Sequence, residues 1–285
     1  AMDAYNRHLV KKIAVKGITK TGSTALDSYV YIQSINLSKE APTATIQFDC
    51  RSASGIQRRT RTVGIGFNLY EHSGRDAKLE EYRDGFVIRS IDGRDDSVEF
   101  LNGIKLHAGD VMGEVSEEQL RRIQIRETIL SHLERERQLF HKGIKVLSLF
   151  FLDEVAHYKV YNEAGQAGNG LYAQMFEEEY EDVVRMTEWI KEDRAYQRYL
   201  EAIPASAAHA GYFSIDRKGG RERFVNSKIT DKKERLSDDI SAYDLIMRDK
   251  ERLLNLDPKR SPVRFLFSHS ALREGWDNPN VFQIC

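Results

Sequence analysis

Hydrophobic and polar residues alternate over much of the first third of the chain, which is the pattern of half-buried strands. The clearest stretch has an apolar residue at every second position: Val63, Ile65, Phe67 and Leu69. Turn-forming pairs separate these stretches, and Asn102-Gly103 lies between two short apolar runs. An Asn-Gly pair in that context predicts a hairpin with a two-residue turn. We therefore expect an antiparallel, β-rich subdomain over residues 1–115.

The period of the pattern changes to that of a helix after residue 115. Ser116-Glu-Glu-Gln119 has the form of a capping box that begins a helix, and Gly143 is placed to end it. The apolar positions between them fall on one stripe: Leu120, Ile123, Leu130, Leu133 and Phe140. Intervening charged residues such as Arg126 are expected on the solvent face. A continuous apolar run, residues 144–152, follows at once, and a helix followed by a buried strand is typical of a parallel sheet.

The rest of the chain repeats this alternation. Helical spacing predominates over residues 156–203. Residues 238–254 form an amphipathic helical pattern that leads to a last strand at 263–267. The order predicts an α/β domain with a parallel sheet over residues 116–285.

Composition restricts the class of protein further. The 285 residues carry a formal net charge of −1 with 31% charged residues, so any surface for DNA must be a local basic cluster. Cys50 and Cys285 are the two cysteines, which excludes a disulfide framework or a cysteine zinc site. No apolar stretch approaches the roughly 20 residues of a membrane span. We expect a cytoplasmic protein that does not enter the membrane.

The densest basic cluster lies in the β-rich part and contains Arg51, Arg58, Arg59 and Arg61. Guanidinium groups on a strand can contact DNA phosphates, and Arg59 and Arg61 would point to the same side. A solvated strand face is the more common meaning of such a run. Both interpretations stay open.

Asp153-Glu154 follows an apolar strand, as the carboxylates of a Walker B motif do. A nucleotide hydrolase also needs a phosphate-binding loop earlier in the same domain. The nearest candidate, Gly17-Ile-Thr-Lys-Thr-Gly-Ser-Thr24, has Ser23 where the lysine must stand. A complete hydrolase that uses Asp153 and Glu154 is therefore the weakest of the functional hypotheses.

The segment Leu272-Arg-Glu-Gly-Trp-Asp277, followed by Pro279, resembles motif V of superfamily 2 helicases. More closely, it resembles the motor subunit (Res) of type III restriction enzymes. A ligand-free turn could use the same turn residues, but the resemblance extends over a dozen positions. Residues 145–155 likewise resemble motif IV of that family, and residues 211–216 resemble its next strand. The resemblance implies the second RecA-like domain, preceded by an accessory β element, and a fragment that stops before motif VI.

The resemblance also implies roles for individual residues. Gly275 and Asp277 match the positions that lie against the ribose and phosphates of ATP. The family's threonine that contacts DNA phosphate corresponds to His269, so the flanking Ser268 or Ser270 would have to supply the hydroxyl. Arg273 would contact a phosphate or the neighbouring domain, with a surface salt bridge as the alternative.

In that family the full subunit uses ATP and Mg²⁺ to move on double-stranded DNA and cleaves DNA with a nuclease domain. Its expected partners are a methyltransferase (Mod) subunit and the first RecA-like domain of the same chain. The sequence here contains no phosphate loop and no motif VI, so we expect no catalytic residues, no metal site and no bound cofactor. The alternative function is a stand-alone nucleic-acid-binding module without ATPase activity. The motifs identified above predict neither the DNA sequence that the enzyme recognises nor its oligomeric state.

Overall fold

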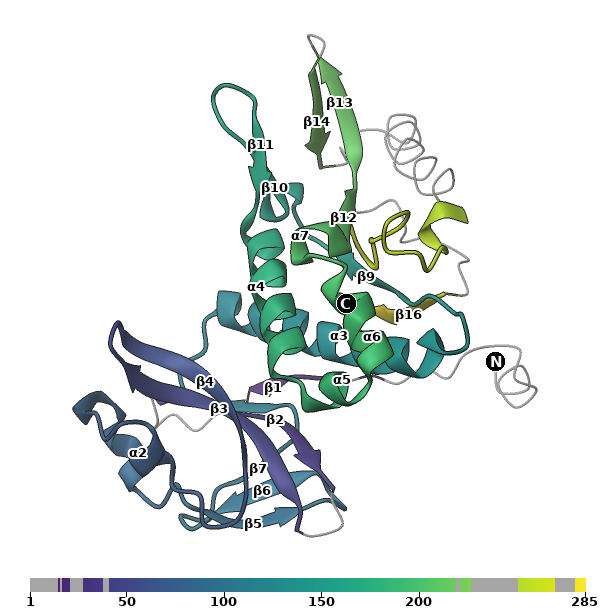
Figure 1. Cartoon of the computed structure of the whole chain (residues 1–285). Helices are drawn as coiled ribbons and strands as arrows, with labels where there is room; N and C mark the ends of the chain where they lie inside the picture. The colour runs from purple at the N-terminus through teal and green to yellow at the C-terminus, as the bar shows by residue number, and fades with distance from the viewer. Residues whose placement is uncertain are drawn as a thin grey trace, which may run out of the picture. The chain divides into compact units, whose positions relative to one another are not determined.

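The computed structural model describes residues 15, 17–20, 28–37, 41–218, 221–226, 251–269 and 280–285. The chain divides into two compact units, Ala1–Leu120 and Arg121–Cys285, whose elements Figure 1 labels. Within the described ranges, no helix has the length and apolar character required to cross a membrane.

The first unit contains two sheets. The larger has five strands in the order β1-β8-β2-β3-β4: β1 (Thr19–Lys20), β2 (Val30–Asn36), β3 (Thr43–Ser52), β4 (Gly55–Val63) and β8 (Asp110–Met112). The smaller contains β5 (Ile88–Asp92), β6 (Ser97–Phe100) and β7 (Lys105–His107). Neighbouring strands are antiparallel in both sheets except for the β1–β8 pair. The expected antiparallel β-rich part is therefore present.

Alternating burial along β3 forms the core of the first unit. Ala44, Ile46, Phe48 and Cys50 point to the buried face, while their neighbours are partly or fully exposed. The short helices α2 (Leu69–His72) and η1 (Ala77–Arg83) follow β4. Buried Tyr82 of η1 donates a hydrogen bond of 2.5 Å to the carbonyl of Tyr29. The phenol thereby ties η1 to the sheet.

Two local predictions for this unit need correction. The strand predicted from Val63 to Leu69 ends at Val63, because Gly66 adopts φ +85° and Leu69 begins α2. The alternating pattern continued into a turn whose Ile65 side chain is 60% exposed. The hairpin between β6 and β7 is present, but Phe100 pairs with Ile104, which makes a three-residue loop with Gly103 at φ +82°.

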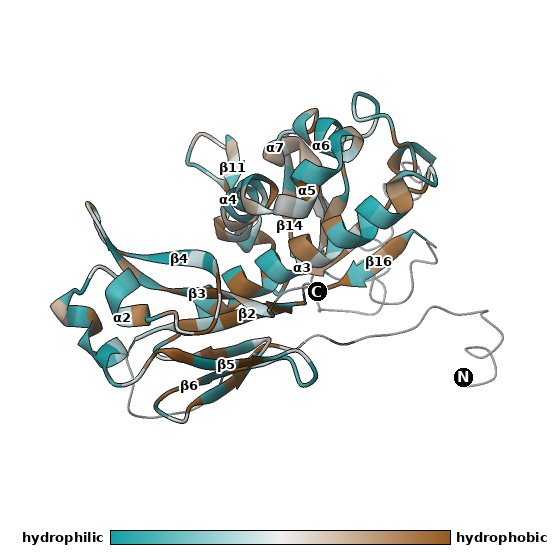
Figure 2. Cartoon of the chain, turned by 60° about the horizontal axis from the view of Figure 1, so that its bottom comes forward, coloured by the Kyte–Doolittle hydropathy of each residue, from teal (hydrophilic) through white to brown (hydrophobic). Residues whose placement is uncertain are grey.

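Most of helix α3 (Glu117–Phe140) belongs to the second unit, which begins at Arg121. The capping box is confirmed: the Gln119 amide donates to Ser116 Oγ at 3.2 Å, and Gln119 Oε1 accepts from the Ser116 amide at 2.9 Å. Gly143 ends the helix with φ +71°. The expectation that Arg126 faces solvent is wrong, because Arg126 is buried and its NH1 donates to Glu179 at 2.7 Å. Hydrophobic and hydrophilic positions alternate around α3 in Figure 2.

A four-stranded sheet in the order β12-β15-β9-β16 forms the centre of the second unit. Its strands are β9 (Leu147–Phe151), β12 (His209–Tyr212), β15 (Phe265–Ser268) and β16 (Val281–Ile284). Each neighbouring pair is parallel. The prediction of a RecA-like α/β arrangement with a parallel sheet, preceded by an antiparallel β-rich part, is confirmed.

Helices and hairpins connect these strands. The helical elements are η2 (Val155–His157), α4 (Leu171–Met186), α5 (Glu188–Glu192), α6 (Arg194–Glu201) and α7 (Ala205–Ala208). Two antiparallel hairpins, β10–β11 (Lys159–Tyr161 and Ala167–Asn169) and β13–β14 (Ser214–Lys218 and Arg221–Val225), extend from the sheet region (Figure 1). The helix expected over residues 238–254 lies mostly outside the described residues.

A buried polar network lies between α3 and the sheet. Glu136 and Arg264 are both fully buried, and Arg264 NH1 donates to Glu136 Oε2 at 2.5 Å. Tyr196 donates to the same carboxylate oxygen at 2.8 Å, and Tyr180 accepts from Arg264 NH2. His132 Nε2 lies 3.5 Å from Glu136 Oε1. We call these five side chains the Glu136 network.

Candidate functional site

The carboxyl ends of β9 and β15 lie side by side, and this edge is where ligands bind in open α/β sheets. The Leu152 amide donates to the Ser268 carbonyl at 2.9 Å. One residue further along each strand, His269 Nε2 lies 2.8 Å from the Asp153 carbonyl. The residues after β9 and after β15 are therefore held together at one edge of the sheet.

Asp153 is the exposed carboxylate of this edge. Its Oδ1 accepts from the Glu154 amide at 3.0 Å and lies 2.9 Å from His157 Nδ1. Partial burial opposes ionisation, but these hydrogen bonds more than offset it and lower the pKa of Asp153. The side chain is thus a carboxylate at neutral pH, with Oδ2 making no hydrogen bond to the part of the chain that the structure describes.

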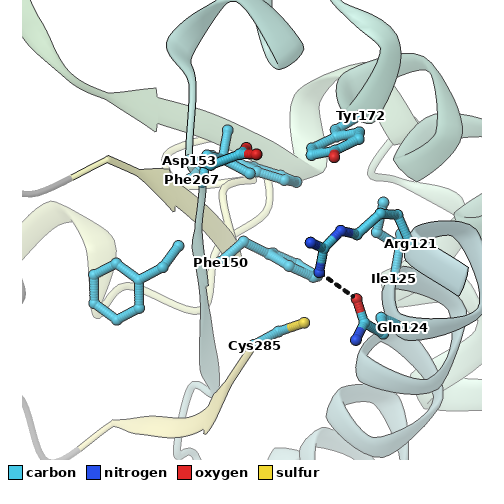
Figure 3. Close-up of a pocket in the computed structure, with 10 residues that line it drawn as sticks. Arg121, Gln124, Ile125, Phe150, Asp153, Tyr172, Phe267 and Cys285 are labelled. Atoms are coloured by element: carbon cyan, nitrogen blue, oxygen red, sulfur yellow. Dashed lines mark hydrogen bonds between the residues drawn. The ribbon is translucent and has the colours of Figure 1, made fainter. Parts of the chain in front are cut away.

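A pocket of about 330 Å³ opens beside Asp153. Elements from both sides of the sheet edge line it (Figure 3): Arg121, Gln124, Ile125, Phe150, Phe151, Leu152, Asp153, Tyr172, Phe267 and Cys285. The rings of Phe150 and Phe267 stack with centroids 4.6 Å apart and form its aromatic base. All of these residues belong to the second unit.

The polar side of the pocket comes from the first turns of α3. Arg121 NH1 donates to Gln124 Oε1 at 3.1 Å. The amide oxygen of Gln124 therefore faces Arg121, and its Nε2 donor points away from Arg121. Figure 3 shows both side chains reaching from α3 toward Phe150, with Asp153 and Tyr172 on the far side. The Tyr172 ring packs against that of His157, with centroids 4.6 Å apart. The pocket wall thus carries a guanidinium, an amide and a carboxylate, above a floor that includes two buried phenyl rings.

The thiol of Cys285 completes the lining at the end of β16. The backbone of Cys285 continues the ladder with β9, since its amide donates to the Leu149 carbonyl at 2.9 Å. Burial raises the pKa of the thiol, although Thr128 and Arg121 act in the opposite direction. Cys50, the other cysteine, is buried in the first unit.

Ser268 and His269 are the residues of the predicted DNA contact that the structure describes. Ser268 is fully buried, and its Oγ has no hydrogen-bond partner among the described residues. The same is true of His269 Nδ1. Ser270, Arg273, Gly275 and Asp277 lie outside the described residues. Their assignments to ATP and DNA stay predictions.

The arginines of β4 divide between the two faces of an edge strand. Arg58 pairs in register with Asp49, its Nε lies 3.4 Å from Asp49 Oδ1, and its guanidinium lies 3.6 Å from the centroid of the Tyr29 ring. Arg59 and Arg61 lie on the opposite face and are exposed, with no side-chain partner among the described residues. The structure brings Arg59 and Arg61 together as expected and separates Arg58 from them.

Sequence reasoning did not find the pocket residues Arg121, Gln124 and Tyr172. Arg121 and Gln124 are one helical turn apart near the start of α3, and Tyr172 lies in the first turn of α4. Such positions are usually solvated, and nothing in their local pattern distinguishes them. They acquire a common role through the packing of two helices on the sheet.

A parallel sheet covered by helices, with its candidate site at the carboxyl edge, defines the second unit as a RecA-like α/β domain. The chain is 36% identical over 191 residues to the Res subunit of the type III restriction-modification enzyme EcoP15I of Escherichia coli, covering 65% of this chain and 17% of that subunit. It is 34% identical over 194 residues to the EcoPI Res subunit of Escherichia phage P1, covering 66% of this chain and 18% of the relative. It is 28% identical over 305 aligned positions to the StyLTI Res subunit of Salmonella typhimurium, covering 100% of this chain and 26% of the relative.

These matches confirm the family resemblance: the chain is homologous to the Res subunits of type III restriction-modification enzymes. It spans between 17% and 26% of the length of these relatives. No protein-family model matches the chain, and no solved structure gives a significant match.

Proposed function

We propose that this chain provides the second RecA-like domain of a type III restriction enzyme motor, in which ATP is coupled to movement along double-stranded DNA. The observation that carries the proposal is the position of His269 beside Asp153, at the carboxyl edge of a parallel sheet. The sequence that resembles motif V continues directly from this point. Motor domains bind nucleotide and nucleic acid with residues at such edges.

In the whole subunit, Gly275 and Asp277 would lie against ATP, with Mg²⁺ held together with the first RecA-like domain. A glycine allows the backbone to approach a ligand closely. This chain by itself neither hydrolyses ATP nor binds it tightly, because the β- and γ-phosphates lack a lysine-bearing loop. DNA-stimulated ATP turnover by the purified chain, abolished by Asp153→Asn, would contradict this proposal and support the stand-alone hydrolase.

The test of Asp277 uses the full-length subunit with its methyltransferase partner. Asp277→Ala should lower both the ATPase rate and translocation while the circular dichroism spectrum is unchanged, since a loop carboxylate contributes little to a core. Asn278→Ala is the matched control, because it alters the neighbouring turn residue. If Asp277→Ala unfolds the protein while ATPase per folded molecule stays normal, Asp277 is a turn former.

DNA binding by this chain is proposed to be weak and independent of sequence, with Arg59, Arg61, Arg273 and the hydroxyl of Ser270 meeting phosphates. The predicted alternative, Ser268, is fully buried and cannot reach a phosphate in this structure. Contacts to phosphates position a protein but carry no sequence information. The dissociation constant should fall in the non-specific range, ~10⁻⁴ to 10⁻⁶ M at physiological salt. A preference for a defined sequence would instead favour the stand-alone binding module.

The β4 contribution can be measured separately. Arg59→Ala/Arg61→Ala should flatten the plot of log affinity against log salt by ~1.8 if both guanidiniums contact phosphates of a duplex. Arg83→Ala/Arg89→Ala removes the same charge from exposed residues in the same unit that already pair with Glu80 and Glu99. An equal effect of both double substitutions would mean that only the net charge matters and that β4 makes no contact.

A further inference from the structure

Strand β4 forms one edge of the five-stranded sheet, and its outer side pairs with no other strand in the described part of the chain. It is nine residues long, contains no proline and pairs with β3 in an unbroken register from Gly55 to Val63. Proteins usually keep exposed edges short or interrupt them with bulges and prolines. The opposite edge of the same sheet, β1, has two residues, and the edge strand β16 has four residues with a register shift. The β4 edge has none of these interruptions.

Hydrogen bonds of the neighbouring strand β3 show which backbone groups of β4 point outward. The amide of Arg51 donates to the Ser73 carbonyl at 2.7 Å. The amide of Asp49 donates to the Tyr82 hydroxyl at 3.1 Å. Both amides therefore point away from β4. In an antiparallel pair, the residues opposite such positions also direct their N–H and C=O groups away from the ladder.

The residues opposite Asp49 on β4 and one pair further on are Arg58 and Ile56. Because the pattern alternates along the strand, Thr60 and Thr62 share their orientation. The N–H and C=O groups of these four β4 residues point outward, and no described residue bonds them. Such a row of backbone groups is a template for an additional strand.

The side chains of Arg59 and Arg61 determine which strand can pair with this edge. Both are exposed and lie two residues apart on one face of β4. A second copy of β4 that paired antiparallel about Thr60 would bring Arg59 opposite Arg61, and like charges directly opposite one another are destabilising. A strand with carboxylates at two alternate positions would instead place one carboxylate opposite each guanidinium. The charges that oppose self-pairing therefore favour an acidic partner.

The other face of β4 calls for uncharged side chains. The guanidinium of Arg58 is already used, because its Nε lies 3.4 Å from Asp49 Oδ1 and its Cζ lies 3.6 Å from the centroid of the Tyr29 ring. The remaining side chains of this face include Ile56, which is 37% exposed, and Thr62. Threonine and valine fit such a half-exposed strand surface. The occupant should thus be acidic on one face and uncharged on the other.

We propose that the outer edge of β4 binds an extended, acidic segment of a partner protein as an additional strand, with carboxylates at alternate positions opposite Arg59 and Arg61. Main-chain hydrogen bonds supply the affinity in this mode of binding, and alternate side chains supply the specificity. DNA phosphates at the same guanidiniums would leave the outward N–H and C=O groups of β4 unpaired. The inference does not rest on the proposed function. Because DNA and an acidic strand would compete for Arg59 and Arg61, the experiment must separate them.

The experiment uses the chain with a short peptide in which glutamate alternates with threonine and valine, and with a control peptide that has lysine in place of glutamate. Affinity is measured by fluorescence anisotropy, and strand pairing by the exchange rates of β4 amide hydrogens in NMR spectra. The glutamate peptide should bind at least ~fivefold more tightly than the lysine peptide. It should slow exchange at Arg58, Thr60 and Thr62. The amides of Gln57 and Arg59 already bond to β3 and should change little.

Thr60→Pro removes one outward N–H group and should weaken binding of the glutamate peptide at least ~fivefold. Proline is tolerated on an edge strand where the N–H faces solvent, so the fold should persist. Thr60→Ala is the matched control: both substitutions remove the hydroxyl that accepts from Gln47, but alanine keeps the N–H and should bind normally. A glutamate peptide with methylated backbone amides tests the same hydrogen bonds from the partner's side, whatever the folding of Thr60→Pro. Arg59→Glu/Arg61→Glu should reverse the preference in favour of the lysine peptide.

Four outcomes decide the inference. Peptide binding that neither slows exchange of the β4 amides nor weakens on backbone methylation would reflect charge attraction alone and overturn the added strand. A dimer of the chain alone, with the same amides protected, would overturn the acidic partner in favour of a second copy. Failure of the glutamate peptide, while duplex DNA binds and Arg59→Ala/Arg61→Ala weakens it, would overturn the added strand and leave the proposed DNA contact standing. Peptide binding with protected amides, and no DNA binding, would support the added strand and remove the DNA contact.

Discussion

Removing Arg264 should destabilise the second unit more than most single changes. Arg264 and Glu136 are both fully buried, and the guanidinium NH1 lies 2.5 Å from Glu136 Oε2. Arg264→Met keeps the length of the side chain but leaves the carboxylate without its cation. Breaking a buried ion pair by removing one partner costs about 3–5 kcal/mol, because the remaining charge is uncompensated.

The pH dependence of stability gives an independent measure of the same interaction. Burial disfavours the charged form of Glu136, but Arg264 and His132 outweigh it and lower the pKa to about 2, against 4.5 for the free group. That difference corresponds to ~3 kcal/mol. Because the folded-state pKa is lowered, this stabilisation is present above pH 4.5 and is lost as the pH falls toward 2.

His132 contributes in the same direction. Burial lowers its pKa below 6.5 despite the neighbouring Glu136 carboxylate. The unfolded chain therefore binds a proton at His132 before the folded chain does, so stability falls as the pH drops below 6.5. In Arg264→Met, burial of Glu136 is no longer offset by the guanidinium. The pKa of Glu136 should therefore rise in this variant. The loss of stability at acid pH that Glu136 causes in the wild type should then diminish or reverse.

The assay is urea unfolding of the wild type and Arg264→Met from neutral to acid pH, followed by tryptophan fluorescence, since both tryptophans belong to the second unit. Glu136→Leu/Arg264→Met should recover part of the loss, because replacing both charges by apolar groups is often nearly neutral. Recovery will be incomplete, since Tyr180 and Tyr196 lose hydrogen-bond partners. The reasoning would be refuted if the free energy of unfolding of Arg264→Met lay within about 1 kcal/mol of the wild-type value and depended on pH in the same way.

Three further substitutions test individual contacts, each by urea or thermal unfolding. Lys145→Met should cost about 1–3 kcal/mol, because Lys145 Nζ donates to the carbonyls of Asn255 and Ser261 at 2.9 and 2.6 Å; an unchanged midpoint would mean that water replaces the ammonium. Gly170→Ala should also cost about 1–3 kcal/mol, since a Cβ would lie 2.5 Å from the carbonyl oxygens of Ala156 and His157; full stability would require the start of α4 to move freely. Tyr82→Phe should cost about 1–3 kcal/mol in the first unit through the lost bond to the Tyr29 carbonyl, and a neutral result would show that this carbonyl finds another donor.

Local signals predicted the elements whose causes are local. The capping box of Ser116 and Gln119 and the turn at Gly143 each depend on a few neighbouring residues, and both appear where expected. The alternation of apolar and polar residues beyond Val63 wrongly predicted a strand. The chain turns there because Gly64 and Gly66 permit a turn, and the spacing of apolar residues does not indicate such a turn. The continuous apolar run at residues 144–152 predicted the parallel sheet correctly, because a strand that is buried on both faces is apolar at nearly every position.

Features that depend on distant partners could not be read from the sequence. Arg126 looks like a solvent-facing residue until Glu179 of α4 is placed beside it at 2.7 Å. The pocket has the same origin, since Gln124 and Tyr172 come from different helices and meet only after both have packed on the sheet. Gly275 and Asp277 were identified by family resemblance alone, and their roles stay predictions.

Helix α3 connects the buried core of the second unit to the pocket at its edge. Its first turns carry Arg121 and Gln124, and its later turns carry His132 and Glu136. His132 Nδ1 lies 2.7 Å from Ser148 Oγ on β9, the strand that ends beside the pocket. A helix transmits displacement along its length because its backbone hydrogen bonds resist bending, so a change in the Glu136 network should shift the polar wall of the pocket.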